Sequence, residues 1–307
     1  MIKKNFDIDL LLTNSRVYAE GFLNEGRVSS YIPQLLVQNP ALLAASIIGS
    51  DGACHSTGDH EELFSIQSIS KVISLIYALV TLGEKRVFEK VGVEPSGDPF
   101  NCFIKLETAG EKPFNPFINA GAITITSLLA DNITFDELLA FTCKIFGCDV
   151  AVDEVVFAEE VAAGKRNRSM AYLMQSKGVL GDEVEKYLEY YFRLCAVLVN
   201  TKQLAHMGAV LASGGKSPNS GEQIVPTRIV SIVKAIMLTC GMYDGSGEFA
   251  VSVGLPAKSG IGGGIVACGG GYGIGTFGPA LDVKGNSVGG IKMLQHLSGE
   301  MGLNLFL

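Results

Sequence analysis

The chain has 307 residues, of which 48% are hydrophobic and 18% are charged, and it contains 37 glycines. This composition excludes a disordered protein, and the length allows one large domain or two interleaved lobes around a sizeable core. The net charge of −7 at pH 7, without a cluster of Lys and Arg, excludes a nucleic-acid partner.

The cysteines and histidines do not form a recognisable pattern. Seven cysteines are scattered singly and four histidines are dispersed, so neither a disulfide framework nor a zinc site is indicated. Free thiols fit a reducing compartment, and we expect a cytoplasmic protein. The opening Met-Ile-Lys-Lys could begin a signal peptide, but Asp7 and Asp9 interrupt the apolar region that should follow. No apolar run is long enough for a membrane span, so we expect no membrane partner.

The first part of the chain predicts a sheet against which a helix is buried. Residues 6–24 have helical periodicity, and Pro33 suits the first turn of a short helix. Residues 41–48 and 53–57 flank a turn signal and predict a hairpin. A third short run, at 63–66, leads into an apolar helix.

Residues 84–215 predict an all-helical insertion. Residues 93–112 are loop-like, with several prolines and glycines, and residues 113–122 lead into an apolar helix that ends near Leu129. Further segments with helical periodicity, separated by Gly or Asn, are 135–146, 153–163, 167–177, 181–199 and 201–212.

The last part of the chain returns to sheet. An apolar helix over 227–240 is closed by Gly241, and short β-like runs separated by glycines follow before a final helix at 286–301. This order is expected when both ends of the chain complete one lobe. We therefore predict an α/β (α+β) fold with two lobes. Residues 1–83 and 216–307 form an antiparallel sheet flanked by helices, and residues 84–215 form an all-helical lobe. The active site is expected between the two lobes.

The helix that starts near Ile69 carries an unusual lysine. Apolar residues occupy all of its faces, which predicts a buried helix, and Lys71 lies within it, three residues after Ser68. Burial disfavours the charged amine, so the pKa of Lys71 should fall toward neutrality. One helical turn places this amine beside the Ser68 hydroxyl, an arrangement that can activate a serine nucleophile. The alternative is a serine N-cap followed by a lysine whose amine reaches solvent.

Spacing alone does not single out this pair. Ser-x-x-Lys also occurs at 213–216, in a glycine-rich loop, and at 231–234, in a second apolar helix. The Lys-Ser-Gly at 258–260 favours the first pair, because this order of motifs is found in penicillin-recognising serine enzymes. Such a strand flanks the nucleophile and can lend a backbone N–H to an oxyanion hole. The alternative is an ordinary glycine-rich strand edge.

Two further features are ambiguous or are rejected. Residues 273–278 match Gly-x-Gly-x-x-Gly, but Pro279 follows at once and no crossover helix opens there, so we reject a dinucleotide site. Tyr243 falls in a glycine-rich turn between helix and sheet, where it is either a surface tyrosine or a functional one.

Several longer motifs, in the same order along nearly the whole chain, resemble the serine-dependent glutaminases, which are amidohydrolases with a β-lactamase-like fold. The matching segments are 31–35 (Tyr-Ile-Pro-Gln-Leu), 67–71 (Gln-Ser-Ile-Ser-Lys), 115–122, Glu160 with 166–168, 190–192, 241–245 and 258–264.

The resemblance implies hydrolysis of the side-chain amide of L-glutamine to L-glutamate and ammonia through a serine-linked acyl-enzyme. It also implies that no metal or organic cofactor is needed and that the chain forms a homodimer or homotetramer. Ser68 would be the nucleophile, and Lys71 and Tyr243 would handle its proton, with the choice of base left open. The backbone N–H groups of Ser68 and Ile261 would hold the oxyanion; the family usually has valine where Ile261 stands. The implied glutamine contacts are Tyr31, Ser68, Asn119, Glu160, Asn167, Tyr191, Tyr243 and Ile261.

These residue types suit glutamine. A carboxylate such as Glu160 can pair with the α-ammonium, and asparagine amides can bind the α-carboxylate and N–H groups. Without the resemblance, Glu160 could equally be a helix-surface acid and Asn119 an N-cap. Two other functions stay open. One is a β-lactamase or peptidase-like esterase, although the helical block lacks a Ser-x-Asn or Tyr-x-Asn element. The other is a catalytically silent glutamine-binding or scaffold protein.

Overall fold

The structure is a computed structural model that describes residues 7–96 and 112–307. The Met-Ile-Lys-Lys opening and most of the predicted loop at 93–112 lie outside the described residues. The α-helices of the described residues are α1 (Ile8–Glu20), α2 (Pro33–Leu36), α3 (Ser70–Leu82), α4 (Glu84–Lys90), α6 (Asn119–Ala130), α7 (Phe135–Phe146), α8 (Glu154–Ala163), α9 (Lys165–Ser176), α10 (Val184–Cys195), α11 (Thr201–Ala212), α12 (Thr227–Cys240), α13 (Ser246–Ser252) and α14 (Val288–Met301). The strands are β1 (Ala44–Ile48), β2 (Cys54–Gly58), β3 (Phe64–Ser65), β4 (Leu198–Val199), β5 (Ala257–Ser259), β6 (Gly264–Gly269) and β7 (Tyr272–Phe277), and the 3₁₀ turns are η1 (Leu23–Glu25), η2 (Gln67–Ile69) and η3 (Tyr243–Gly245).

A five-stranded antiparallel sheet is built from both ends of the chain. Its strand order is β2-β1-β7-β6-β5. The predicted hairpin is confirmed, because β1 pairs with β2, and β1 also pairs with β7 from the far end of the chain. The third predicted run, β3, joins a separate two-stranded sheet, in which Phe64 lies opposite Val199 of β4. The expected fold class, helices combined with an antiparallel sheet, is confirmed.

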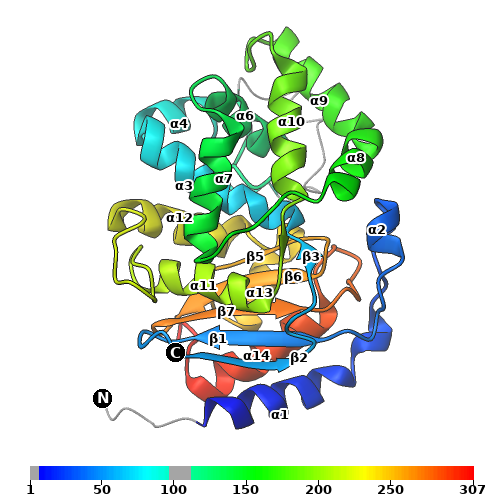
Figure 1. Cartoon of the computed structure of the whole chain (residues 1–307), viewed down its shortest axis with the longest axis vertical. Coiled ribbons are helices and arrows are strands. Elements are labelled where there is room, and N and C mark those ends of the chain that lie inside the picture. The colour runs from blue at the N-terminus through cyan, green and yellow to red at the C-terminus, as the bar shows by residue number, and fades with distance from the viewer. Residues whose placement is uncertain (1–6, 97–111) are drawn as a thin grey trace.

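Helices cover both faces of the large sheet (Figure 1). On one face α1 and α14 pack against each other, while α11 crosses β7, β1 and β6 on the other. The contact between α11 and β7 is close, because a Cβ added at Gly273 would lie only 1.9 Å from the backbone N of Ala209. One added at Gly275 would lie 2.4 Å from the backbone O of Thr201. Close helix packing therefore explains the Gly-x-Gly-x-x-Gly pattern of this strand.

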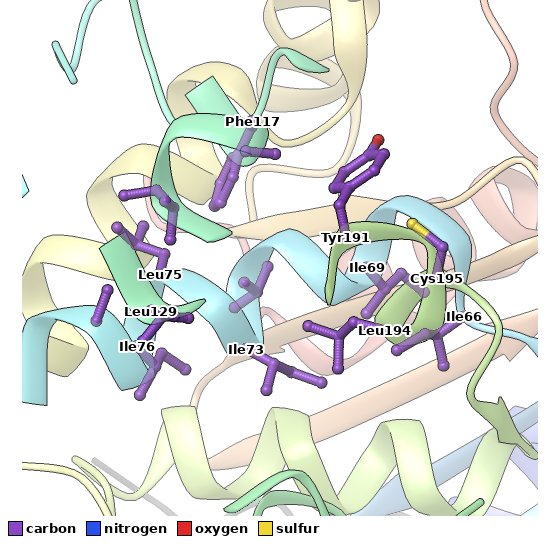
Figure 2. Packing of buried hydrophobic residues seen from close by; sticks show 14 of the residues in the cluster. Ile66, Ile69, Ile73, Leu75, Ile76, Phe117, Leu129, Tyr191, Leu194 and Cys195 are labelled. Atoms are coloured by element: carbon purple, nitrogen blue, oxygen red, sulfur yellow. The ribbon is translucent and has the colours of Figure 1, made fainter. Parts of the chain in front are cut away.

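The largest hydrophobic cluster has α3 near its centre. Ile73 and Ile76 of this helix, and Ile69 just before it, are completely buried. Figure 2 shows Ile69 and Ile73 beside Leu194 of α10, with Leu129 of α6 farther along the helix. Because α3 also contacts α7 and α12, it is covered on all sides, as its uniformly apolar sequence predicts.

The predicted helical block, residues 84–215, is helical in its described part apart from β4. Most of its helices lie together at one end of the molecule (Figure 1), but the last of them, α11, packs on the sheet. We retain the division into two lobes as a proposal, with α11 placed at their junction.

The described part of the chain contains no single helix that combines the length and the apolar composition needed to cross a membrane. A bent pair, Thr227–Cys240 with Tyr243–Ser252, reaches both measures only when the two helices are taken together.

Candidate active site

Ser68 lies where β3 passes into the buried helix. The chain leaves β3 at Ser65 and turns through η2 directly into α3. The turn places Gln67 at a φ of +49°, which is uncommon for a residue with a side chain and is a form of strain that clusters at functional sites. Ser68 is only 7% exposed, and Ile69 rather than Ser68 is the N-cap residue of α3. The N-cap alternative for Ser68 is therefore wrong.

The other two Ser-x-x-Lys matches lie in different surroundings. Ser213 is the C-cap residue of α11, and its hydroxyl donates to the backbone O of Lys216 at 2.7 Å. Ser231 lies on the exposed face of α12. Neither serine enters the cavity described below.

The amine of Lys71, one helical turn after Ser68, is buried and donates to two oxygens. Its Nζ is 2.6 Å from Oδ1 of Asn119 and 3.1 Å from the backbone O of Phe117, both at the start of α6. The side chain is 1% exposed, so the alternative of a lysine that reaches solvent is wrong. Burial lowers the pKa of Lys71 from 10.5 to about 8. A pKa near 8 leaves roughly a tenth of this amine neutral at pH 7.

The loop that follows β5 packs backbone to backbone against the Ser68 turn. A Cβ added at Gly260 would lie 2.5 Å from the backbone O of Ile66, and one at Gly262 would lie 2.4 Å from the backbone O of Ser65. Only glycine permits an approach this close. Ile261, between the two glycines, is thereby held beside Ser68 and lines the same cavity.

Tyr243 is buried beside Ser68 and Ser259, so the surface-tyrosine alternative is wrong. It is 8% exposed and has a φ of +55° in η3. Burial raises the pKa of its hydroxyl to about 12, while hydrogen bonding with Ser68, with Ser259 and with the Ile261 backbone acts to lower it. The amine of Lys258 lies 4.4 Å from the centre of the Tyr243 ring, within cation–π range. Burial, followed by the nearby charge of Lys71, lowers the pKa of Lys258.

Two asparagines continue the polar chain away from Lys71. The amide nitrogen of Asn119 donates to Oδ1 of Asn167 in α9 at 3.0 Å, and both side chains are buried. Asn119 is the first residue of α6, whose N-cap is Ile118, so the N-cap alternative for Asn119 is also wrong. Tyr191 is buried nearby in α10, and burial raises the pKa of its hydroxyl.

Glu160 is a buried acid, although its helix is largely exposed. It is 2% exposed, and the hydroxyl of Tyr31 donates to its Oε2 at 3.3 Å. Burial raises the pKa of this carboxyl to about 7, whereas hydrogen bonds from Gln67 and Tyr31 act to lower it. A buried carboxylate with hydrogen-bonding capacity to spare suits an ammonium group. The helix-surface alternative for Glu160 is wrong.

These side chains meet at a cavity of about 770 Å³. Most of the predicted residues line its wall; Lys71 lies behind Asn119, and Tyr243 lies behind Ser68. Sequence analysis did not assign roles to Gln67 or Cys195, which also line it. The position of Gln67 next to the serine was a usable signal, whereas nothing in the sequence marked Cys195. Figure 2 shows the thiol of Cys195 near the Tyr191 ring, one helical turn away on α10.

Among residues 7–96 and 112–307, no group of three or more His, Cys, Asp and Glu side chains could hold a metal ion. Around Ser68 the cavity wall instead offers neutral amides, hydroxyls and the buried carboxyl of Glu160, with the amine of Lys71 behind Asn119, and charged side chains such as Arg166 and Lys284 also line the cavity. Such a donor set suits a small molecule that carries an ammonium, a carboxylate and an amide.

Comparison with known proteins gives a family. A family model described as Glutaminase matches residues 26–306. Glutaminase 2 of Clostridium perfringens is 45% identical over 309 residues, which covers 99% of this chain and 100% of the relative. A glutaminase of Clostridium tetani is 47% identical over 291 residues, which covers 93% of this chain and 95% of the relative.

Solved structures agree with these relatives. A probable glutaminase from Bacillus subtilis, complexed with 6-diazo-5-oxo-L-norleucine, superimposes with a TM-score of 0.90 at 37% identity over 100% of this chain and 99% of its own. A covalent complex between a Bacillus subtilis glutaminase and 5-oxo-L-norleucine gives a TM-score of 0.87 at 36% identity over 98% and 100% of the two chains.

The fold and the site are those of an amidohydrolase with a β-lactamase-like fold. The chain belongs to the glutaminase family. It hydrolyses the side-chain amide of L-glutamine to L-glutamate and ammonia. Two alternative functions were left open by the sequence. A β-lactamase or peptidase-like esterase would share this fold, and a catalytically silent glutamine-binding protein would share this site. The family match favours neither of them.

We predict that Lys71→Met changes how stability depends on pH. The folded protein holds Lys71 at a pKa of about 8, below its ordinary value of 10.5, so the unfolded chain binds more protons between these pH values. This group therefore makes wild-type stability rise with pH over that window, by up to about 1.4 kcal/mol per pH unit. Urea unfolding at pH 7 to 10 should show a smaller rise in Lys71→Met, which keeps only the part contributed by other groups such as Lys258.

Lys216→Met, which removes an exposed lysine of another Ser-x-x-Lys match, is the matched control and should keep the wild-type slope. Parallel curves for wild type and Lys71→Met would show that the Lys71 amine is not buried at a lowered pKa.

Proposed function

We propose that Ser68 is the nucleophile and that glutamine hydrolysis passes through a γ-glutamyl ester on its Oγ. The observation that carries this proposal is the position of Ser68, which lines the cavity one helical turn before the buried amine of Lys71 and close to the buried hydroxyl of Tyr243. The covalent complex of the Bacillus subtilis neighbour gives support, because a glutamine-like diazoketone reacts there with the protein.

The proposed reaction has two halves. Ser68 Oγ attacks the side-chain carbonyl carbon while its proton leaves, and the backbone N–H groups of Ser68 and Ile261 stabilise the oxyanion. Collapse of the tetrahedral intermediate breaks the C–N bond, and the departing nitrogen takes a proton and leaves as ammonia. Water then attacks the ester, returns a proton to Ser68 Oγ and releases glutamate. No step passes through a metal or an organic cofactor.

Lys71 is the better candidate for the base. Its pKa of about 8 leaves roughly a tenth of the amine neutral at pH 7, whereas a pKa of about 12 leaves Tyr243 ionised in only about one molecule in 10⁵. We propose that Lys71 accepts the Ser68 proton and that Tyr243 orients Ser68. The proton then reaches the leaving nitrogen from Lys71 directly or by way of Tyr243.

The substrate contacts are proposed from charge and position. Glu160, assisted by Tyr31, binds the α-ammonium of glutamine. The amides of Asn119 and Asn167, with the Tyr191 hydroxyl, bind the α-carboxylate and fix the substrate in line with Ser68.

We predict that Ser68→Ala lowers ammonia release by at least about 10⁴-fold while the thermal unfolding temperature stays unchanged, because only the attacking oxygen is lost. A coupled glutamate-formation assay measures the loss. Ser231→Ala, which removes the serine of another Ser-x-x-Lys match, should retain full activity. Turnover near the wild-type level in Ser68→Ala would sink the mechanism.

We also predict that kcat/KM for glutamine falls below pH 7. Burial raises the pKa of Glu160 to about 7, so lowering the pH protonates this carboxyl and removes its attraction for the substrate ammonium. Glu160→Gln should make this acidic limb less steep, because only the part set by protonation of Lys71 remains, and it should lower kcat/KM at pH 8 by about a hundredfold or more. Glu159→Gln alters the neighbouring acid, which accepts from the Gln34 backbone, and should keep the limb. An unchanged limb in Glu160→Gln would contradict the assignment.

We further propose, on the family resemblance, that the chain works as a homodimer or homotetramer in the cytoplasm. Free thiols at the six described cysteines are consistent with a reducing compartment. Light scattering of the purified protein should give a mass of two or four chains; a monomer at micromolar concentration would contradict the assembly.

A further inference from the structure

Two adjacent acids of α8, Glu159 and Glu160, both hold the segment of chain that carries Tyr31. The hydroxyl of Tyr31 donates to Glu160 Oε2 at 3.3 Å, and the backbone N–H of Gln34 donates to Glu159 Oε2 at 2.9 Å. Figure 1 shows α2, which begins one residue before Gln34, next to α8. One helix therefore contacts this segment through two neighbouring side chains.

Tyr31 lies on a part of the chain without regular structure of its own. Residues 28–32 form neither a helix nor a continuous strand, and Tyr31 is 38% exposed while it lines the cavity. A side chain on such a segment can meet a substrate in a defined geometry only if other contacts fix its backbone. The position of Tyr31 therefore depends on what holds the residues that follow it.

Glu159 supplies a cap that α2 lacks. The N-cap residue of α2 is Ile32, whose apolar side chain accepts no hydrogen bond from the first turn. The Gln34 N–H is one of the donors that such a helix end leaves without a partner in the helix. The carboxylate of Glu159 accepts it from the neighbouring helix, and a hydrogen bond to a charged acceptor is stronger than one between neutral groups.

The connection between Gln34 and Tyr31 is stiff. The ring of Pro33 fixes its own φ, and it disfavours the helical conformation of the residue before it. Ile32 accordingly has an extended backbone, with φ −133° and ψ 153°. Its side chain is 1% exposed and belongs to a small apolar cluster with Val156 of α8. Fixing the Gln34 N–H therefore also fixes the direction in which Tyr31 leaves the backbone.

We infer that Glu159 is a positioning residue for glutamine binding: by holding the Gln34 N–H, it places the Tyr31 hydroxyl against Glu160, where both contact the substrate ammonium. The inference rests on the proposed roles of Tyr31 and Glu160 as substrate contacts. Without Glu159, the segment is free to shift and the Tyr31 hydroxyl moves away from Glu160. The loss falls on binding, because Glu159 contacts none of the reacting atoms.

Steady-state kinetics with glutamine and calorimetric binding of L-glutamate test this role. Glu159→Ala should raise both KM for glutamine and Kd for glutamate by about fivefold or more, with kcat within about twofold of wild type. Glu159→Gln keeps an oxygen that can accept from the Gln34 N–H and should recover most of the affinity. Glu154→Ala removes an exposed acid of the same helix that faces Arg193, and it should leave both constants unchanged.

A double variant tests whether Glu159 acts through Tyr31. Once Tyr31→Ala has removed the positioned side chain, adding Glu159→Ala should change KM by less than about twofold. KM and Kd do not depend on how much of each preparation is folded, and kcat is expressed per binding site counted by calorimetry. Partial misfolding of a variant therefore does not imitate the expected result.

The outcomes distinguish this inference from the proposed substrate contacts. Three results would overturn the role of Glu159 alone, provided that Tyr31→Ala and Glu160→Gln themselves weaken glutamate binding. They are a Glu159→Ala variant that binds as well as Glu154→Ala, a Glu159→Gln variant as weak as Glu159→Ala, and an undiminished effect of Glu159→Ala in the Tyr31→Ala background. Wild-type affinity in both Tyr31→Ala and Glu160→Gln would overturn the substrate contacts and the inference together.

Discussion

The buried amine of Lys71 is the interaction on which the rest of the site depends. It donates to the Phe117 carbonyl and to the Asn119 amide, and so joins α3 to the start of α6. Because the oxygen of Asn119 is used by Lys71, its amide nitrogen is directed to Asn167. One amine therefore orients two proposed substrate contacts, and we propose that it also accepts the proton of Ser68. Burial is costly for a charged lysine, and the same cost is what lowers its pKa into the range of a useful base.

The opposite wall depends on close backbone packing. Gly260 and Gly262 allow the loop after β5 to touch the Ser68 turn, and this contact holds the Ile261 backbone beside Ser68, where we propose that the oxyanion develops. Beside it, Lys258 lies over the ring of Tyr243 and shares its buried environment. Two residues with side chains, Gln67 and Tyr243, accept a positive φ on either side of this wall. Such strain persists only where surrounding contacts fix it, and both residues are buried.

Local patterns predicted much of the fold. The hairpin, most helices and the burial of α3 follow from periodicity, turn residues and caps, which act over a few neighbours. The pairing of β3 with β4 was not predictable, because it joins segments more than 130 residues apart. The glycines of β7 resembled a nucleotide motif because a sequence does not show that α11 packs against them.

The site was predictable only in part, because several of its contacts also join segments that are far apart in the chain. Ser68 and Lys71 are one helical turn apart, so their proximity could be inferred from spacing. The burial of Glu160 depends on Tyr31 and Gln67, which lie far away in the chain, and only the family resemblance singled it out. The inward position of Tyr243 is set by tertiary contacts alone.

The central claim is that Ser68 Oγ forms the covalent bond to the substrate. Peptide mapping by mass spectrometry, after the wild-type protein has been inactivated with 6-diazo-5-oxo-L-norleucine, tests it most directly. The account predicts one 5-oxo-norleucyl group per chain on Ser68, with protection by glutamate. Stoichiometric labelling of another side chain, such as the thiol of Cys195 in the same cavity, or inactivation that leaves Ser68 unmodified, would contradict it.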